Sequence, residues 1–84
     1  MTQKRKIVLV KWIDSMQTGG WRHKEAARSN MNCMSCGFLV ERTRDYIILA
    51  LNMSAYTDGD YIQIPMVAVK SVKTLHTVEQ PEDK

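Results

Sequence analysis

The chain contains the stretch Cys36-Gly-Phe-Leu-Val-Glu-Arg-Thr-Arg-Asp-Tyr-Ile-Ile-Leu-Ala-Leu51. Two apolar runs flank a short, polar and charged turn in this stretch, and that pattern predicts a β-hairpin. The second run is apolar on both faces from Ile47 to Leu51, as is typical of a central strand or of a strand at a subunit contact. The sequence therefore predicts β structure at its centre, with Ile47, Leu49 and Leu51, or the edge of the fourth predicted strand, as candidates for a subunit contact.

Segments on both sides of the hairpin also have the composition of strands. The first is rich in β-branched and aromatic residues, and Gly37 in the second predicts a bulge or a sharp bend. Asp58-Gly59 predicts a tight turn, and Pro65, which cannot donate a ladder hydrogen bond, ends the strand that follows. We predict five strands, over residues 6–13, 32–40, 45–53, 61–64 and 69–75, with a 3₁₀ turn at 65–68.

These segments together predict an all-β domain, a five-stranded and strongly bent small barrel of the SH3-like or Sm-like kind. Its first connection, 16–30, is a long loop whose composition favours a short helix at 23–30. A two-layer α+β fold with a real helix there is the alternative. We predict a single domain over 6–75, between a flexible basic N-terminus at 1–5 and a disordered polar tail at 76–84.

Composition sets the class of the protein. With 84 residues, the domain has a small core and gains from self-association, so we predict a homo-oligomer. No apolar run approaches the ~20 residues of a membrane span, and the basic start of the chain lacks the apolar segment of a signal peptide because Lys11 and Asp14 interrupt it. We therefore expect a cytoplasmic protein.

Charge is divided unevenly along the chain. Residues 1–44 hold nine basic and three acidic side chains, and residues 45–84 hold three basic and six acidic ones, so that formal charges of +6 and −3 add to the net +3. Such polarity suits the binding of an anionic ligand through one face or the head-to-tail pairing of two copies. A solvated surface of uneven charge is the alternative.

The pair Cys33 and Cys36 forms a C-x-x-C motif, which is typical of half a zinc site or of a redox pair. If 32–40 is a strand, the two sulfurs point to opposite faces, so we predict two ordinary thiols with Cys36 buried. His23 and His76 have no nucleophile or carboxylate at a motif spacing. We predict no enzymatic activity, no metal and no cofactor.

The first loop holds the best candidate binding element, Gly19-Gly20-Trp21-Arg22-His23-Lys24. A large aromatic ring beside three potential cations suits stacking on a base and neutralisation of phosphate. The alternative is that Trp21 covers one end of the barrel as a lid. The predicted ligand-binding residues are Trp21, Arg22, His23, Lys24 and Tyr56, and Trp12, which shares its parity with Val8 and Val10, is predicted in the core or at the barrel mouth.

Five landmarks of the sequence also carry a resemblance. They are Val10-Lys-Trp-Ile-Asp-Ser15, Gly20-Trp21, Cys36-Gly-Phe-Leu-Val40, Asp45-Tyr-Ile-Ile-Leu-Ala50 and Ile64-Pro65. This pattern, over residues 10–75, resembles small uncharacterised accessory proteins of tailed bacteriophages. The resemblance implies action in the host cytoplasm, where such proteins bind and disable host or defence factors.

These observations lead to one expected function and one alternative. We expect a non-enzymatic phage accessory protein that binds a host or defence protein or sequesters a nucleotide-like ligand. The alternative is a small-barrel nucleic-acid-binding protein, with basic side chains on phosphates and Trp21 as a stacking platform. The candidate basic residues are Lys4, Arg5, Lys6, Arg22, Lys24 and Arg28. A structural component of the virion is a third class.

Overall fold

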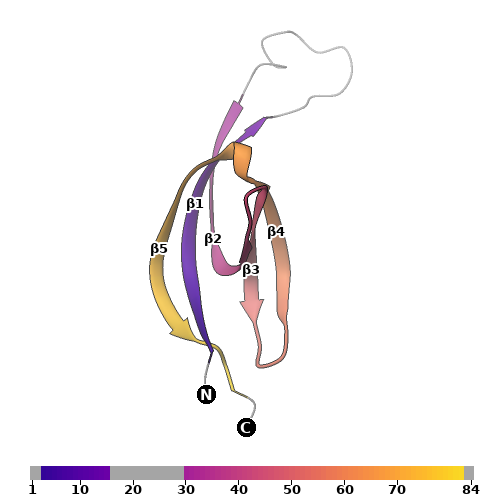
Figure 1. The fold of residues 1–84 in the computed structure, drawn as a ribbon, viewed down its shortest axis with the longest axis vertical. Coiled ribbons are helices and arrows are strands. Elements are labelled where there is room, and N and C mark those ends of the chain that lie inside the picture. Colours follow the sequence, from indigo (N-terminus) through magenta and orange to yellow (C-terminus); the bar gives the residue numbers. More distant parts are fainter. Residues whose placement is uncertain (1–2, 16–29, 83–84) are drawn as a thin grey trace.

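A computed structural model describes residues 3–15 and 30–82 of the chain, and it confirms an all-β fold for them. Five strands form one antiparallel sheet in the order β4-β3-β2-β1-β5, and a short 3₁₀ helix, η1, joins β4 to β5 (Figure 1). The elements are β1 (Lys4–Ser15), β2 (Asn30–Arg42), β3 (Tyr46–Met53), β4 (Asp58–Pro65), η1 (Met66–Ala68) and β5 (Val69–Glu79). The predicted helix at 23–30 lies almost wholly outside the described residues, and Asn30 itself begins β2.

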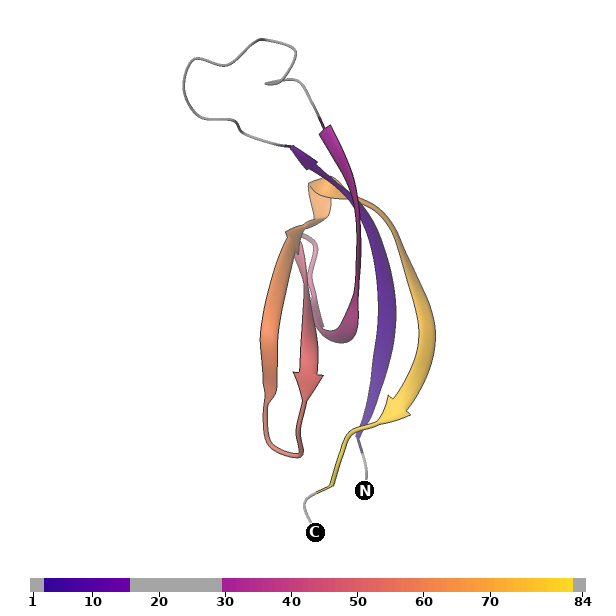
Figure 2. The same ribbon diagram turned by 180° about the vertical axis from the view of Figure 1, so that it is seen from behind.

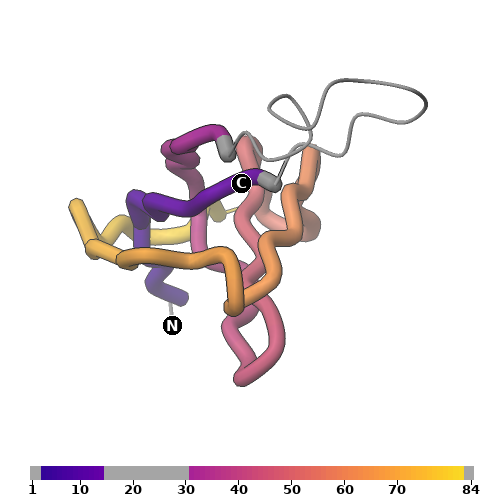
Figure 3. Tube along the Cα trace, turned by 90° about the horizontal axis from the view of Figure 1, so that it is seen from above, coloured from indigo at the N-terminus to yellow at the C-terminus, as the bar shows by residue number. Residues whose placement is uncertain are grey.

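The second strand bends the sheet. β2 pairs with β1 up to Phe38 and with β3 from Phe38 onward, so Phe38 faces both Ile7 and Ala50 across its two ladders. A register shift between Leu39 and Glu41 marks a bulge in this strand, and Figure 3 shows β2 changing direction as it passes between the two halves of the sheet. The bulge that the sequence predicts at Gly37 thus falls a few residues later, because Gly37 itself stays paired.

Gly37 has a different role, which is close packing. A Cβ atom at this position would lie 2.7 Å from the backbone oxygen of Ala50 and 3.3 Å from the Cβ of Leu49. Gly37 is paired with Val8 on β1 at the same time. The absence of a side chain therefore lets the bent β2 cross close to β3.

The sheet is strongly bent but not closed as a barrel. β4 and β5 are its two edges, and no ladder joins them. Figure 2 shows β3 and β4 on one side of the molecule and β1 and β5 on the other, with η1 connecting the two sides at one end. The fold is therefore an open, bent sheet and not the small barrel that the sequence predicts.

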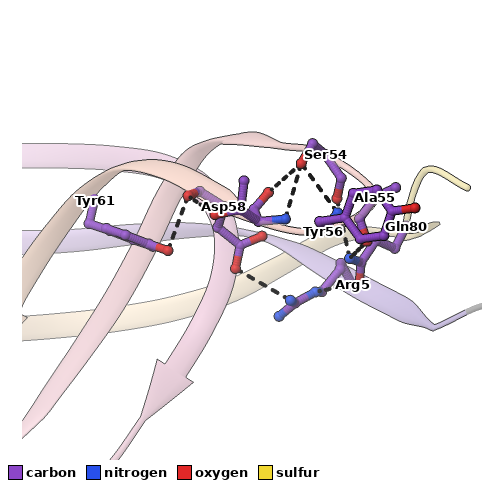
Figure 4. A network of polar contacts seen from close by, with 8 residues as sticks. Arg5, Ser54, Ala55, Tyr56, Asp58, Tyr61 and Gln80 are labelled. Atoms are coloured by element: carbon purple, nitrogen blue, oxygen red, sulfur yellow. Dashed lines mark hydrogen bonds and ion pairs between the residues drawn. The ribbon is translucent and has the colours of Figure 1, made fainter. Parts of the chain in front are cut away.

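A group of polar contacts holds the two sides together at the opposite end (Figure 4). The Arg5 guanidinium lies 3.3 Å from an oxygen of the Asp58 carboxylate, and the Arg5 side chain also donates to Gln80. The Gln80 amide donates in turn to the carbonyl oxygens of Ser54 and Ala55. This group, which we call the clasp, connects the ends of β1 and β5 to the turn between β3 and β4.

The core lies between the two sides of the bent sheet. Trp12 packs against it as predicted, and its indole N–H donates to the Ser35 hydroxyl at 3.0 Å. Ile47 and Leu49 are 0% and 1% exposed, so the prediction that they form a subunit contact is wrong. β3 is apolar on both faces because both are buried there: Ile47 and Leu49 belong to the core, and Ala50, of the opposite parity, is also 0% exposed. The buried hydrophobic residues are Val8, Val10, Ile47, Leu49, Ala50 and Ile64.

The first and last strands are longer than predicted. β1 begins at Lys4, so the predicted flexible N-terminus at 1–5 is partly a strand, and β5 continues to Glu79, so 76–79 is not a disordered tail. These residues pair with each other, with Lys4 opposite Glu79 and Ile7 opposite His76. Backbone pairing of two long neighbouring strands outweighs the polar composition of their ends.

The turn between β3 and β4 is not the predicted Asp-Gly turn. Residues 54–57 form it: the Ser54 N–H donates to the Thr57 carbonyl at 2.8 Å, and the Ser54 hydroxyl accepts from the Tyr56 and Thr57 N–H groups. A hydroxyl that satisfies backbone donors in this way stabilises a turn without glycine. Gly59 instead pairs with Asn52 inside β4.

Candidate binding surface

Three large apolar side chains that folding leaves exposed line a single groove. Met34 is 70% exposed, Leu51 64% and Tyr61 58%. They come from β2, β3 and β4, and the groove has a volume of about 460 Å³. We call it the corner groove. It is lined by Met34, Ser35, Cys36, Leu51, Asp60, Tyr61 and Ile62.

The bend of β2 explains why this groove exists. The first half of β2, which carries Met34 and Cys36, pairs with β1. The second half pairs with β3, and β3 pairs in turn with β4. Gly37, which has no side chain, lets β2 approach β3 closely where β2 bends. Residues of β2, β3 and β4, among them Met34, Leu51 and Tyr61, therefore line one groove at this crossing.

Polar contacts position one wall of the corner groove. The Tyr61 hydroxyl donates to the Asp58 carbonyl at 3.2 Å, as Figure 4 shows, so one end of the ring is held. Asp60 has a positive φ of 57° and accepts a hydrogen bond from the Asn52 amide. An acidic group therefore lies at the margin of an otherwise mainly apolar groove.

A second groove lies on the other side of Met34. It has a volume of about 320 Å³ and takes its charge from Lys11 and Lys70. We call it the lysine groove. The Trp12 indole packs against the core and also forms part of the lining of this groove. The lysine groove is lined by Lys11, Trp12, Asn32, Cys33, Met34 and Lys70.

The two cysteines lie on opposite faces of β2, as predicted from strand alternation. Cys33 is opposite Trp12 and Cys36 is opposite Leu9 in the β1 ladder. Cys36 is exposed and Cys33 is half-buried, so the prediction of a buried Cys36 is wrong. The face that carries Cys36 is the outer one, away from Val8 and Val10. In the described segments no group of three metal-ligating side chains occurs.

Most of the predicted ligand-binding residues lie outside the described residues. These are Trp21, Arg22, His23 and Lys24. Tyr56 is described and is 80% exposed, in the turn between β3 and β4. Figure 1 shows this turn near the two chain termini, at the opposite end of the sheet from the end of β1 and the start of β2. Tyr56 is therefore far from the residues that bound the first loop.

Folding changes how charge is divided. β1 and β5 together carry six basic and two acidic side chains, whereas β4 carries two acidic ones and no basic one. The sequence divides charge between 1–44 and 45–84, but β5 brings Lys70 and Lys73 beside β1. Within the sheet that the structure describes, the basic side is thus the pair of strands β1 and β5.

Sequence reasoning missed both grooves. In the sequence, Met34 is one apolar position of an alternating strand, and Leu51 continues an apolar run whose residues are expected to be buried. One signal was present, because Met34, Cys36 and Phe38 make one face of β2 apolar while Leu39, on its other face, packs against the core. A strand that is apolar on both faces near a sheet bend is a candidate for an exposed contact surface.

Comparison of the chain with protein-family models, curated proteins and solved structures gives no match. Within the described residues, no helix has the length and apolar character needed to cross a membrane.

Proposed function

We propose that this protein is a non-enzymatic binding module that captures another protein in the corner groove. The observation that carries this proposal is the convergence of Met34, Leu51 and Tyr61, each more than half exposed, on one groove. Apolar side chains gathered on a concave surface favour a partner that buries them, because burial removes their area from water. Scattered exposed apolar residues would carry no such argument.

The lining of the groove indicates the chemistry of the partner. Met34 is flexible and polarizable and adapts to the shape of an apolar anchor, and Tyr61 offers a large ring whose hydroxyl is already held by the Asp58 carbonyl. Asp60 at the margin favours a basic group beside that anchor. We therefore expect a partner segment with an aromatic or aliphatic side chain next to Lys or Arg.

The resemblance to phage accessory proteins supports a biological setting for this function. In that setting the chain acts in the cytoplasm of an infected bacterium, and its partner is a host or defence protein. Such proteins act by occupying a surface of their target, which requires a binding groove and no catalytic group. Self-association of the chain remains a prediction alongside this function.

Capture from a bacterial lysate followed by mass spectrometry tests the proposal. Met34→Glu and Leu51→Glu each place a charge in the corner groove, and Val67→Glu is the matched control because Val67 is 98% exposed in η1 and does not line the groove. The captured partner is then purified, and its affinity for each variant is measured by calorimetry. We expect the two groove variants to bind at least about tenfold more weakly and the control to bind like the wild type.

Two results would contradict the proposal. Equal affinity of the groove variants and the control for the partner would show that the partner binds outside the corner groove. The second contradicting result would come from light scattering. If the chain forms an oligomer that Met34→Glu abolishes, and no other protein binds the groove, then the groove serves self-association and not a host partner.

The affinity for the partner should change little between low and moderate salt, because the contact is mainly apolar.

A further inference from the structure

Three lysines gather where β5 begins beside β1. In the ladder between these strands Lys11 pairs with Ser71, and Lys73 occupies the next position on the same face of β5. Lys11 and Lys73 are therefore diagonal neighbours, a relation that places side chains about 7–8 Å apart at the backbone. Lys70 lines the lysine groove together with Lys11, and all three side chains are exposed.

A β-bulge brings Lys70 into this cluster. Trp12 pairs with Val69 and Lys11 with Ser71, so the register shifts between them and Lys70 has no residue opposite it. In a regular strand Lys70 and Lys73 would point to opposite faces. A bulge interrupts that alternation and re-aims a side chain, which accounts for Lys70 and Lys11 lining one groove.

The charge of this cluster is not neutralised by the described part of the chain. None of the described residues that line the lysine groove is acidic, and no ion pair connects Lys11, Lys70 or Lys73 to another residue of 3–15 or 30–82. Like charges on neighbouring positions of a sheet repel each other, and a bound anion relieves this repulsion. Asn32 adds an uncharged amide, which offers two N–H donors.

We propose that the lysine groove binds the phosphate groups of a nucleotide or of a nucleic-acid strand. Lysine ammonium groups bind phosphate as point charges with several donors, and a volume of about 320 Å³ is within the range of small-ligand sites. The groove is an open hollow beside an exposed sheet edge, so both a free nucleotide and one unit of a longer strand have access to it. This site shares Met34 with the proposed protein contact, but its ligand would be held by the ammonium groups of Lys11 and Lys70, which do not line the corner groove.

The test compares two double variants that lose the same charge. Lys11→Gln/Lys70→Gln removes the two lysines of the groove, and Lys4→Gln/Lys6→Gln removes two exposed lysines from the other end of β1. Binding of ATP is measured by calorimetry, and binding of a fluorescent single-stranded oligonucleotide is measured by anisotropy, both at low and at moderate salt. Circular dichroism melts confirm that each variant is folded.

The groove variant is expected to bind at least about tenfold more weakly, and the control variant less than about threefold more weakly. For the oligonucleotide, the slope of log affinity against log salt should become shallower by about 0.7 for each lysine removed. Selective loss with ATP identifies a free nucleotide as the ligand, and selective loss with the oligonucleotide alone identifies a strand. Equal loss in both double variants, or no binding of either ligand at low salt, would overturn the proposal.

Discussion

Replacement of Gly37 by alanine tests how the bent strand is packed. The new Cβ would lie 2.7 Å from the Ala50 oxygen and 3.3 Å from the Leu49 Cβ, and both neighbours belong to the adjacent strand β3. Neither atom is the far end of a flexible side chain, so β2 or β3 must move. Movement of either strand disturbs the packing around Leu49, which is buried in the core.

Two effects of opposite sign decide the outcome. Alanine reduces the freedom of the unfolded chain and for that reason stabilises by about 0.4–1 kcal/mol when the native backbone accepts it. The φ of Gly37 lies outside the left-handed region, so the backbone itself accepts alanine. Overpacking of a filled site costs roughly 1–3 kcal/mol. The clash should win, and we expect the free energy of unfolding to fall by about 1–2 kcal/mol.

Gly59→Ala is the matched control for this prediction. A Cβ at Gly59 meets only the Asn52 Cβ, at 4.0 Å, which is ordinary contact. This variant should therefore be as stable as the wild type or more stable by up to about 1 kcal/mol. Urea unfolding followed by circular dichroism measures both variants. If Gly37→Ala proves as stable as Gly59→Ala, the close approach of β2 to β3 described above is incorrect.

Three further outcomes are expected. Arg5→Met leaves the largely buried Asp58 carboxylate without its counter-ion, and the free energy of unfolding in urea should fall by about 1–3 kcal/mol. The double variant Arg5→Met/Asp58→Asn should lose less stability than this single variant. An equal or larger loss in the double variant would contradict the clasp. The hydrogen bond from Tyr46 to Glu41, together with the negative charge of that carboxylate, raises the pKa of Tyr46 above 10.0. This contact therefore stabilises the fold below pH 10.0. The stabilisation is lost as pH rises through the pKa of Tyr46 in the folded protein. Glu41→Gln should lower that pKa in an NMR titration of the ring, and an unchanged pKa would count against the contact. Light scattering should show a homo-oligomer, and a monomer mass at all concentrations would disprove it.

The sequence predicted the central hairpin because its signals are local. Two apolar runs around Thr43-Arg44-Asp45 leave few alternatives to a turn, and the Thr43 hydroxyl indeed accepts the N–H groups of Asp45 and Tyr46. The position of Trp12 also followed from alternation, since it shares a face with Val8 and Val10 and packs on them. Local pattern is sufficient where one face of a strand is buried.

Features that depend on partners distant in sequence were not predictable in this way. The end of β5 is a strand because β1 pairs with it, although its own composition is polar. The bulge that turns Lys70 toward Lys11 is likewise visible only in the ladder between two strands that are far apart in sequence. Leu51 continues an apolar run that is buried at Leu49, yet it lies beyond the region that β2 covers.

The placement of the two grooves allows their roles to be separated from folding. The fully buried core is formed by side chains of β1, β3 and β4, and no groove residue belongs to it. Exposed side chains such as Met34 and Lys70 bury little area on folding, so their replacement should change stability by no more than about 0.5 kcal/mol. Trp12 differs because it lines the lysine groove and also packs on the core. A loss of binding in Met34 or Lys70 variants therefore reports on the surface, whereas a loss in a Trp12 variant would combine binding with stability.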